Sequence, residues 1–162
     1  MTLGSRPATR LLLTAGAASV LLLAVTGCEK PNPGVSVWSG TTSQHTQALC
    51  WSADATQSVE AAGCARDVIT KAREGGQIPE ISVIPGDTIG ISVDPKVAAN
   101  GWIPEVGSEP LATAPITSTY FRFTFPDLQS VPAEGLELRV LASGESNNDL
   151  RGLWVYRLVP AP

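Results

Sequence analysis

The chain has 162 residues, which is enough for one domain with a hydrophobic core of its own. Its 11 basic and 15 acidic residues give a net charge of −4, and the basic residues are scattered singly. Phosphate binding needs clustered lysine and arginine side chains, so no nucleic-acid partner is expected. The chain holds one histidine and three cysteines, which lack the clustered spacing of zinc ligands, and we expect neither a metal nor another cofactor.

Residues 1–27 have the three parts of an export signal. Arg6 and Arg10 form the positive end, residues 11–25 are apolar, and small residues follow. As a helix the apolar part is roughly 22 Å long, short of the roughly 30 Å hydrocarbon layer, which favours cleavage over an uncleaved membrane anchor. Residues 23–28, Leu-Ala-Val-Thr-Gly-Cys, resemble a bacterial lipobox.

The lipobox resemblance implies that residues 1–27 are removed and that Cys28 carries a diacylglyceryl group. Two acyl chains anchor a protein stably, so we expect the mature chain on the outer face of the cytoplasmic membrane. A simple secreted protein is the alternative. Residues 28–34, with two prolines, are predicted to form an extended tether, and residues 35–162 the folded domain.

Two further cysteines, Cys50 and Cys64, remain in the exported chain. An even pair outside the cytoplasm predicts a disulfide, and a closed loop of about 15 residues stabilises by roughly 3 kcal/mol. A redox couple or a thiol nucleophile is the alternative. It is disfavoured because the pair lacks the Cys-x-x-Cys spacing and a partner histidine.

The first half of the domain mixes strand and helix patterns. Alternation predicts strands over residues 35–38 and 46–51, with turn residues at 40–43, and a thin apolar stripe predicts a helix over residues 65–74 that ends at glycine. Two alternating runs within residues 79–94 meet at Pro85-Gly86, which suits a type II turn. A β-hairpin is the simplest interpretation, although such turns also link strands in opposite sheets.

Residues 94–101 have helix punctuation at both ends. Asp94 can cap, Pro95 fits the first helical position, and Asn100-Gly101 ends the turn. We expect about one turn of helix that returns Trp102 to the core.

The second half reads as strands separated by loops. A long connection is expected over residues 107–119. The strand predicted over residues 120–125 has three phenylalanines on one face, and apolar and polar residues alternate over residues 136–140. Residues 153–159 are nearly continuously apolar, as in a central strand. Seven or eight short strands with little helix predict a single antiparallel β-sandwich, immunoglobulin-like in general architecture, with one or two short helices. A small β-barrel is the alternative.

Several motifs read together resemble one family. They are the lipobox, the cysteine pair, the segment at residues 84–95 (Ile-Pro-Gly-Asp-Thr-Ile-Gly-Ile-Ser-Val-Asp-Pro), Gly101-Trp102, and Arg-Gly-Leu-Trp at residues 151–154. The chain resembles a family of putative actinobacterial lipoproteins, domain of unknown function 2771. The resemblance implies the compartment and a single domain, and it transfers no activity and no site residue.

No catalytic constellation is predicted. His45 follows turn residues and is expected to be exposed in a turn. Residues 90–94, Gly-Ile-Ser-Val-Asp, lack the last glycine of a nucleophile elbow and fall in a predicted strand. The four tryptophans are expected in the core or at its lid, although an exposed aromatic pair would suit a protein or sugar-like ligand.

The leading hypothesis is therefore a non-enzymatic, lipid-anchored module that binds an envelope protein or a cell-wall component. The alternative is a cofactor-free envelope hydrolase or carbohydrate-active protein that uses carboxylates, since any two acidic residues can meet in space. A deep pocket with two carboxylates of perturbed pKa would favour the enzyme, and a sealed sandwich with a flat face would favour binding.

Overall fold

The computed structural model describes residues 30–59, 66–125, 132–146 and 149–162, and Pro31–Pro162 forms one compact unit. The predicted signal segment at residues 1–27, the lipidation residue Cys28 and the disulfide partner Cys64 lie outside the described residues. In the described part of the chain, no helix is both long and apolar enough to cross a membrane.

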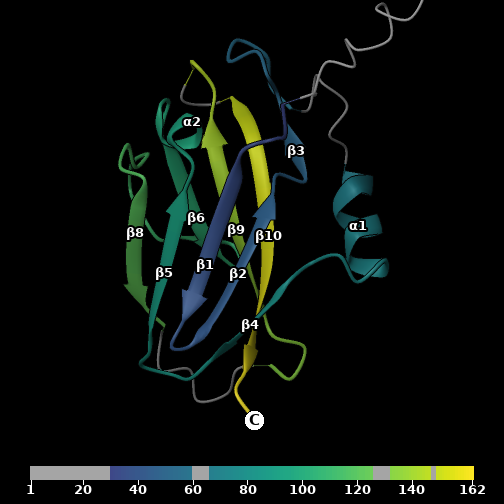
Figure 1. The fold of residues 1–162 in the computed structure, drawn as a ribbon, viewed down its shortest axis with the longest axis vertical. Coiled ribbons are helices and arrows are strands. Elements are labelled where there is room, and N and C mark those ends of the chain that lie inside the picture. The colour runs from purple at the N-terminus through teal and green to yellow at the C-terminus, as the bar shows by residue number, and fades with distance from the viewer. Residues whose placement is uncertain (1–29, 60–65, 126–131, 147–148) are drawn as a thin grey trace, which may run out of the picture. The chain divides into compact units, whose positions relative to one another are not determined.

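Two sheets pack face to face, with sheet A toward the viewer in Figure 1 and β9 and β10 of sheet B behind it. Sheet A has the order β2-β1-β5-β8, formed by Thr42–Gln47, Gly34–Ser39, Thr88–Val93 and Tyr120–Thr124. Sheet B has the order β3-β10-β9-β6-β7, formed by Cys50–Trp51, Leu150–Pro160, Leu136–Ser143, Trp102–Val106 and Glu109–Pro110. All of these neighbours are antiparallel.

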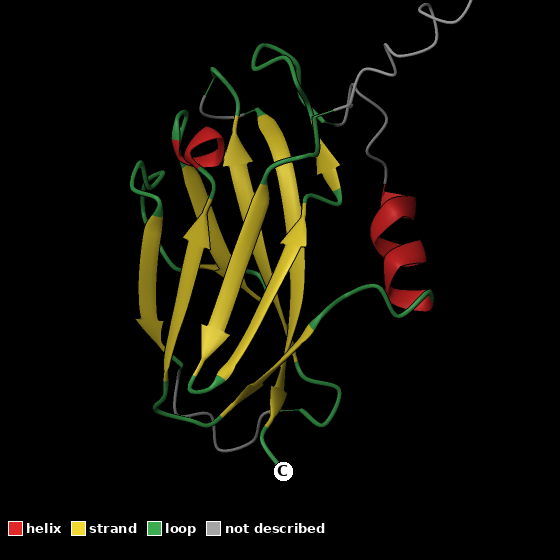
Figure 2. Ribbon diagram, viewed as in Figure 1, coloured by secondary structure: helices red, strands yellow, loops and turns green. Residues whose placement is uncertain are grey.

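The predicted β-sandwich is confirmed, and the barrel alternative is wrong because the sheets do not close on each other. Strands dominate, and the described residues include two short helices, α1 (Arg66–Glu74) and α2 (Pro95–Ala98), drawn in red in Figure 2. The long strand β10 lies inside sheet B, as its continuous apolar pattern predicts, with β9 along one side and two short strands along the other.

The core lies between the sheets and is built mainly from the inward positions of β1, β5, β6, β9 and β10. Its largest fully buried side chains are Trp102, Trp154, Tyr156, Phe125, Ile81, Ile89, Ile91, Leu138 and Leu158. Polar atoms of this core are paired: the indole nitrogen of Trp154 donates to the Pro33 carbonyl at 3.1 Å, and the Tyr156 hydroxyl donates to the Val35 carbonyl at 2.6 Å. These bonds tie β10 of one sheet to the start of β1 in the other.

Helix α1 covers the outward face of sheet B beside β10. Ala72 and the following Ile78 pack with Leu153 and Val155, which are buried although they point away from the main core. The helix ends as predicted at two glycines, and the positive φ of Gly76 (63°) reverses the chain there. Both faces of β10 are therefore covered, which explains the nearly continuous apolar sequence of residues 153–159.

The two runs around Pro85-Gly86 do not form a hairpin. The first run, β4 (Glu80–Val83), pairs in parallel with the end of β10 in sheet B, whereas the second run is β5 in sheet A. Gly86 turns the chain with φ 86°, and its N–H donates to the Phe125 carbonyl, which extends the pairing of β5 with β8 in sheet A. The turn thus links opposite sheets, the second of the two possibilities that its sequence allows.

Three local predictions need correction. The strand predicted over residues 46–51 is divided, because residues 46–47 end β2 in sheet A and residues 50–51 form β3 in sheet B. Thr42 and Ser43 belong to β2, because the reversal after β1 is complete within Gly40-Thr41, with Gly40 at φ 54°. Asp94 stands at the start of α2 but makes no capping hydrogen bond, since its carboxylate accepts the Gly34 N–H at 2.7 Å and so fastens α2 to β1. Trp102 does return to the core and is fully buried.

Candidate functional site

The outward face of sheet A carries the residues with the most chemistry. Side chains alternate along each strand, so those next to the core positions Val35, Val37, Ile89 and Ile91 point outward. We call the central part of this surface the aromatic face, defined as Ser36, Trp38, Ser43, His45, Gly90, Ser92, Tyr120 and Arg122.

Strand pairing places these residues in two rows across the sheet. One row runs His45, Ser36, Ser92, Tyr120 from β2 to β8, and the other runs Ser43, Trp38, Gly90, Arg122. Each row crosses three strand spacings, about 14 Å, and the rows are about 7 Å apart. Residues that are far apart in the sequence therefore form one continuous surface.

Trp38 lies across its neighbouring strand because Gly90 has no side chain. A Cβ atom at Gly90 would be 2.1 Å from Cε2 of Trp38 and within 2.4 Å of the two adjacent ring atoms. Cε2 is bonded to both of the other atoms and is the nearest of the three to this Cβ position. The indole therefore lies with a ring face over the backbone of β5. Glycine within a strand often marks such a close approach, and here it leaves the opposite face of the indole toward solvent.

His45 is held in a similar way at the other end of the face. Its ring lies over Gly34, where a Cβ atom would be 2.3 Å from Cε1, and its Nδ1 is hydrogen-bonded to Ser36 Oγ at 2.9 Å. The predicted exposure of His45 is confirmed, but its placement in a turn is wrong: it is a strand residue of β2. Two rings of the aromatic face are thus positioned by glycines on adjacent strands.

The aromatic face is open to solvent among the described residues. His45, Ser92, Tyr120 and Arg122 are exposed, with Tyr120 at 45%, while α1 covers sheet B and not sheet A. Figure 1 shows α1 beside β10, away from the centre of the front sheet. A partner molecule can therefore reach Trp38 and Tyr120 together.

The other three tryptophans follow the core prediction more closely. Trp102 and Trp154 are fully buried, and Trp51 is partly buried against Trp154 with their ring centroids 5.9 Å apart. The Arg151 guanidinium lies 4.5 Å from the Trp51 ring centroid, which shields that indole from one side. Trp38 is the one tryptophan on the outward face of a sheet in the described part of the chain.

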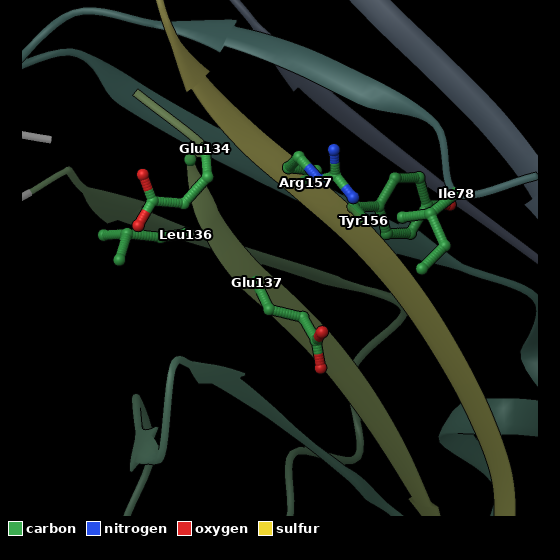
Figure 3. Close-up of a pocket in the computed structure, with 7 residues that line it drawn as sticks. Ile78, Glu134, Leu136, Glu137, Tyr156 and Arg157 are labelled. Atoms are coloured by element: carbon green, nitrogen blue, oxygen red, sulfur yellow. The ribbon is translucent and has the colours of Figure 1, made fainter. Parts of the chain in front are cut away.

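A separate cavity of about 230 Å³ lies beside the start of β9 and the paired part of β10, and Glu134, Glu137, Tyr156 and Arg157 are among its lining residues (Figure 3). Its two carboxylates point in different directions rather than toward a common centre. Burial raises the pKa of Glu137, but hydrogen bonds from Arg73 and Arg139 outweigh it and hold the pKa below the ordinary value. Glu137 is therefore a structural ion-pair partner of α1.

The remaining site predictions have different outcomes. Cys50 is buried in β3, and because Cys64 lies outside the described residues, the disulfide between them stays a prediction. Residues 90–93 lie within β5, which agrees with the rejection of a nucleophile elbow there. The described residues contain no group of three or more histidine, cysteine or acidic residues that could hold a metal ion.

Comparison with known proteins found no matching family model, no matching curated protein and no matching solved structure. The aromatic face is therefore defined by its geometry alone. The sequence pattern placed Arg122 correctly on the outward side of its strand, but Trp38 was expected in the core or at its lid and was not joined to Gly90 or Arg122. The available signal was Gly90 itself, a residue without a side chain inside an otherwise regular alternation.

Proposed function

We propose that this chain is an extracytoplasmic lipoprotein, anchored through Cys28, that binds an envelope component through the aromatic face. The export signal and lipobox in the sequence support the anchor, as does the resemblance to putative actinobacterial lipoproteins. The observation that carries the binding role is the half-buried indole of Trp38 on the outward side of sheet A, held over Gly90 beside Tyr120 and Arg122. Aromatic and arginine side chains dominate binding energy at interfaces.

A binding role is better supported than the hydrolase alternative. A carboxylate general acid needs a raised pKa, but the Glu137 carboxylate is ion-paired to two arginines and its pKa is lowered. The aromatic face offers hydroxyl, imidazole and guanidinium groups on a flat sheet, and its strand positions include no carboxylate. Flat polar and aromatic surfaces suit recognition rather than an enclosed reaction.

Position-specific photocrosslinking in intact producing cells tests the binding role. A diazirine-bearing residue at Ser92 lies within the aromatic face, and one at Glu105 lies on the outward side of sheet B as a matched control. We expect a discrete crosslinked species from position 92 that disappears in the Trp38→Ala variant, and none from position 105. Equal crosslinking from both positions, or a species that Trp38→Ala leaves unchanged, would contradict the proposal.

The anchor is tested by the intact mass of detergent-extracted protein. We expect a chain that begins at Cys28 with an added lipid mass, and a Cys28→Ser variant that keeps residues 1–27 or loses membrane association. A wild-type chain that begins elsewhere, or carries no lipid, would disprove lipidation.

A further inference from the structure

We propose that the aromatic face binds an acidic glycan, in which a sugar ring stacks on Trp38 and a sugar carboxylate pairs with Arg122. This inference rests on the proposed binding function and names the chemistry of its ligand. Three properties of the face carry it: an indole laid over the sheet, a surrounding set of hydroxyl and nitrogen groups, and an arginine that is in none of the ion pairs found among the described residues.

The stacking surface comes from Trp38. Its indole rests on the β5 backbone, so binding a flat ligand on the outer side requires no rearrangement of the ring. Pyranose rings present apolar C–H faces and polar edges, and aromatic side chains complement the apolar faces. Because the ring is already ordered by Gly90, little conformational entropy is lost when a ligand stacks on it.

The polar groups around the indole match the edges of a sugar. Ser36 and Ser92 occupy adjacent strands in the row beside Trp38, and Tyr120 completes that row on β8. Hydroxyl groups both donate and accept hydrogen bonds, as sugar hydroxyls do. The row spans about 14 Å, so the surface fits an oligosaccharide better than one isolated sugar.

The charge of the face selects an acidic glycan. Arg122 is in register with Gly90, immediately beside the indole, and it is exposed. The ion pairs found among the described residues involve Arg73, Arg139 and Arg157 and not Arg122. Asp94, two residues beyond Ser92, accepts a hydrogen bond from the Gly34 N–H.

A guanidinium group binds a carboxylate through two parallel hydrogen bonds, and no acidic residue on the face competes for it. The chain as a whole is acidic, with a net charge of −4. Arg122 gives this face a local positive charge, which would attract an anionic ligand.

Direct binding measurements on the purified full-length protein in detergent test the proposal. The probes are uronic-acid oligosaccharides, neutral gluco-oligosaccharides and polyglutamate, the last carrying carboxylates without sugars. We expect affinity for the uronic-acid probe, weaker binding at higher salt, and at least about tenfold weaker binding to each of the other two probes.

Variants separate stacking from charge pairing. Trp38→Ala and Arg122→Ala should each weaken binding of the uronic-acid probe about tenfold or more. Arg122→Lys should recover part of the loss because it restores charge without the bidentate geometry. Arg157→Ala is the matched control, since Arg157 pairs with Glu80 at the other sheet, and it should bind like the wild type.

Three outcomes would overturn the ligand class: no binding to either saccharide, equal binding of polyglutamate, or tight neutral-glycan binding that Arg122→Ala leaves unchanged. Photocrosslinking from Ser92 distinguishes these failures from failure of the proposed function. If position 92 crosslinks to a protein and the crosslink depends on Trp38, the proposed binding function stands but the glycan ligand is refuted. Absence of any adduct at position 92, together with absent glycan binding, would refute both.

Discussion

At the residue scale, two glycines in sheet A determine how the rings of the aromatic face are presented. Gly90 lies beneath Trp38, and Gly34 lies beneath His45. Any larger residue at either position would occupy space that the ring now fills. The two glycines therefore determine the positions of the Trp38 and His45 rings on the face.

Gly90→Ala should displace the Trp38 indole, because the new methyl group would lie 2.1 Å from Cε2 in the present arrangement. We expect the ¹⁹F resonance of Trp38 in protein labelled with 5-fluorotryptophan to shift and photocrosslinking from the face to fall. Ser92→Ala, at the next outward position of the same strand, should leave that resonance nearly unchanged. An unshifted Trp38 resonance in Gly90→Ala would show that the indole does not rest on β5.

Tyr156→Phe should destabilise the sandwich by about 1–3 kcal/mol, because it leaves a buried carbonyl of β1 without its hydroxyl donor. The hydroxyl of Tyr156 donates to the Val35 carbonyl at 2.6 Å, and burial raises its pKa above the ordinary value of 10.0. Urea unfolding of the variant measures the loss. Tyr120→Phe, at an exposed position, should change stability by less than about 0.5 kcal/mol, and similar losses in both variants would contradict this account.

At the element scale, helix α1 is fastened to sheet B by an apolar contact and an ion-pair network. Ala72 packs toward Leu153 and Val155, while Arg73 reaches Glu137 on β9. The helix leaves sheet A uncovered, so the placement of one short element decides which face of the sandwich remains open.

Glu137→Gln should reduce stability near neutral pH by about 1 kcal/mol. The pKa of Glu137 is lowered in the folded protein, because burial raises it but the Arg73 and Arg139 hydrogen bonds lower it by more. A lowered folded-state pKa means that the stabilisation is present above the unfolded value and is lost as pH falls through the folded value. The difference from wild type should therefore shrink below about pH 4.

Urea midpoints at pH 7 and pH 3 measure this effect. Glu80→Gln is the control, because Glu80 is 56% exposed and its nearest oxygen lies 3.4 Å from Arg157. It should change stability less than Glu137→Gln does. A stability difference between wild type and Glu137→Gln that stays constant with pH would show that the ion pairs do not contribute.

The sequence predicted elements better than it predicted their partners. Alternation identified β1, β5, β8 and β9, and glycine located the end of α1, since these are local properties of the chain. Strand pairing depends on contacts distant in sequence, so Pro85-Gly86 could not by itself distinguish a hairpin from a link between sheets. The same limit hid the aromatic face, whose rows join β2, β1, β5 and β8.

At the scale of the whole molecule, the proposed disulfide would clip the segment between β3 and α1 to the sandwich. Cys64→Ser should lower the free energy of unfolding by about 3 kcal/mol if a loop of about 15 residues is closed in the wild type. Alkylation under denaturing, non-reducing conditions should leave Cys50 and Cys64 unlabelled. Labelling of both thiols in protein extracted from the cell envelope would rule the disulfide out.

The central claim is that the aromatic face is occupied when the protein stands in its envelope. Oxidative footprinting of intact producing cells and of purified full-length protein tests it without knowledge of the ligand. We predict that Trp38 and Tyr120 are oxidised several-fold less in cells, while the partly buried Trp51 changes little and the buried Trp102 resists oxidation in both samples. Equal oxidation of Trp38 in cells and in purified protein would contradict the claim.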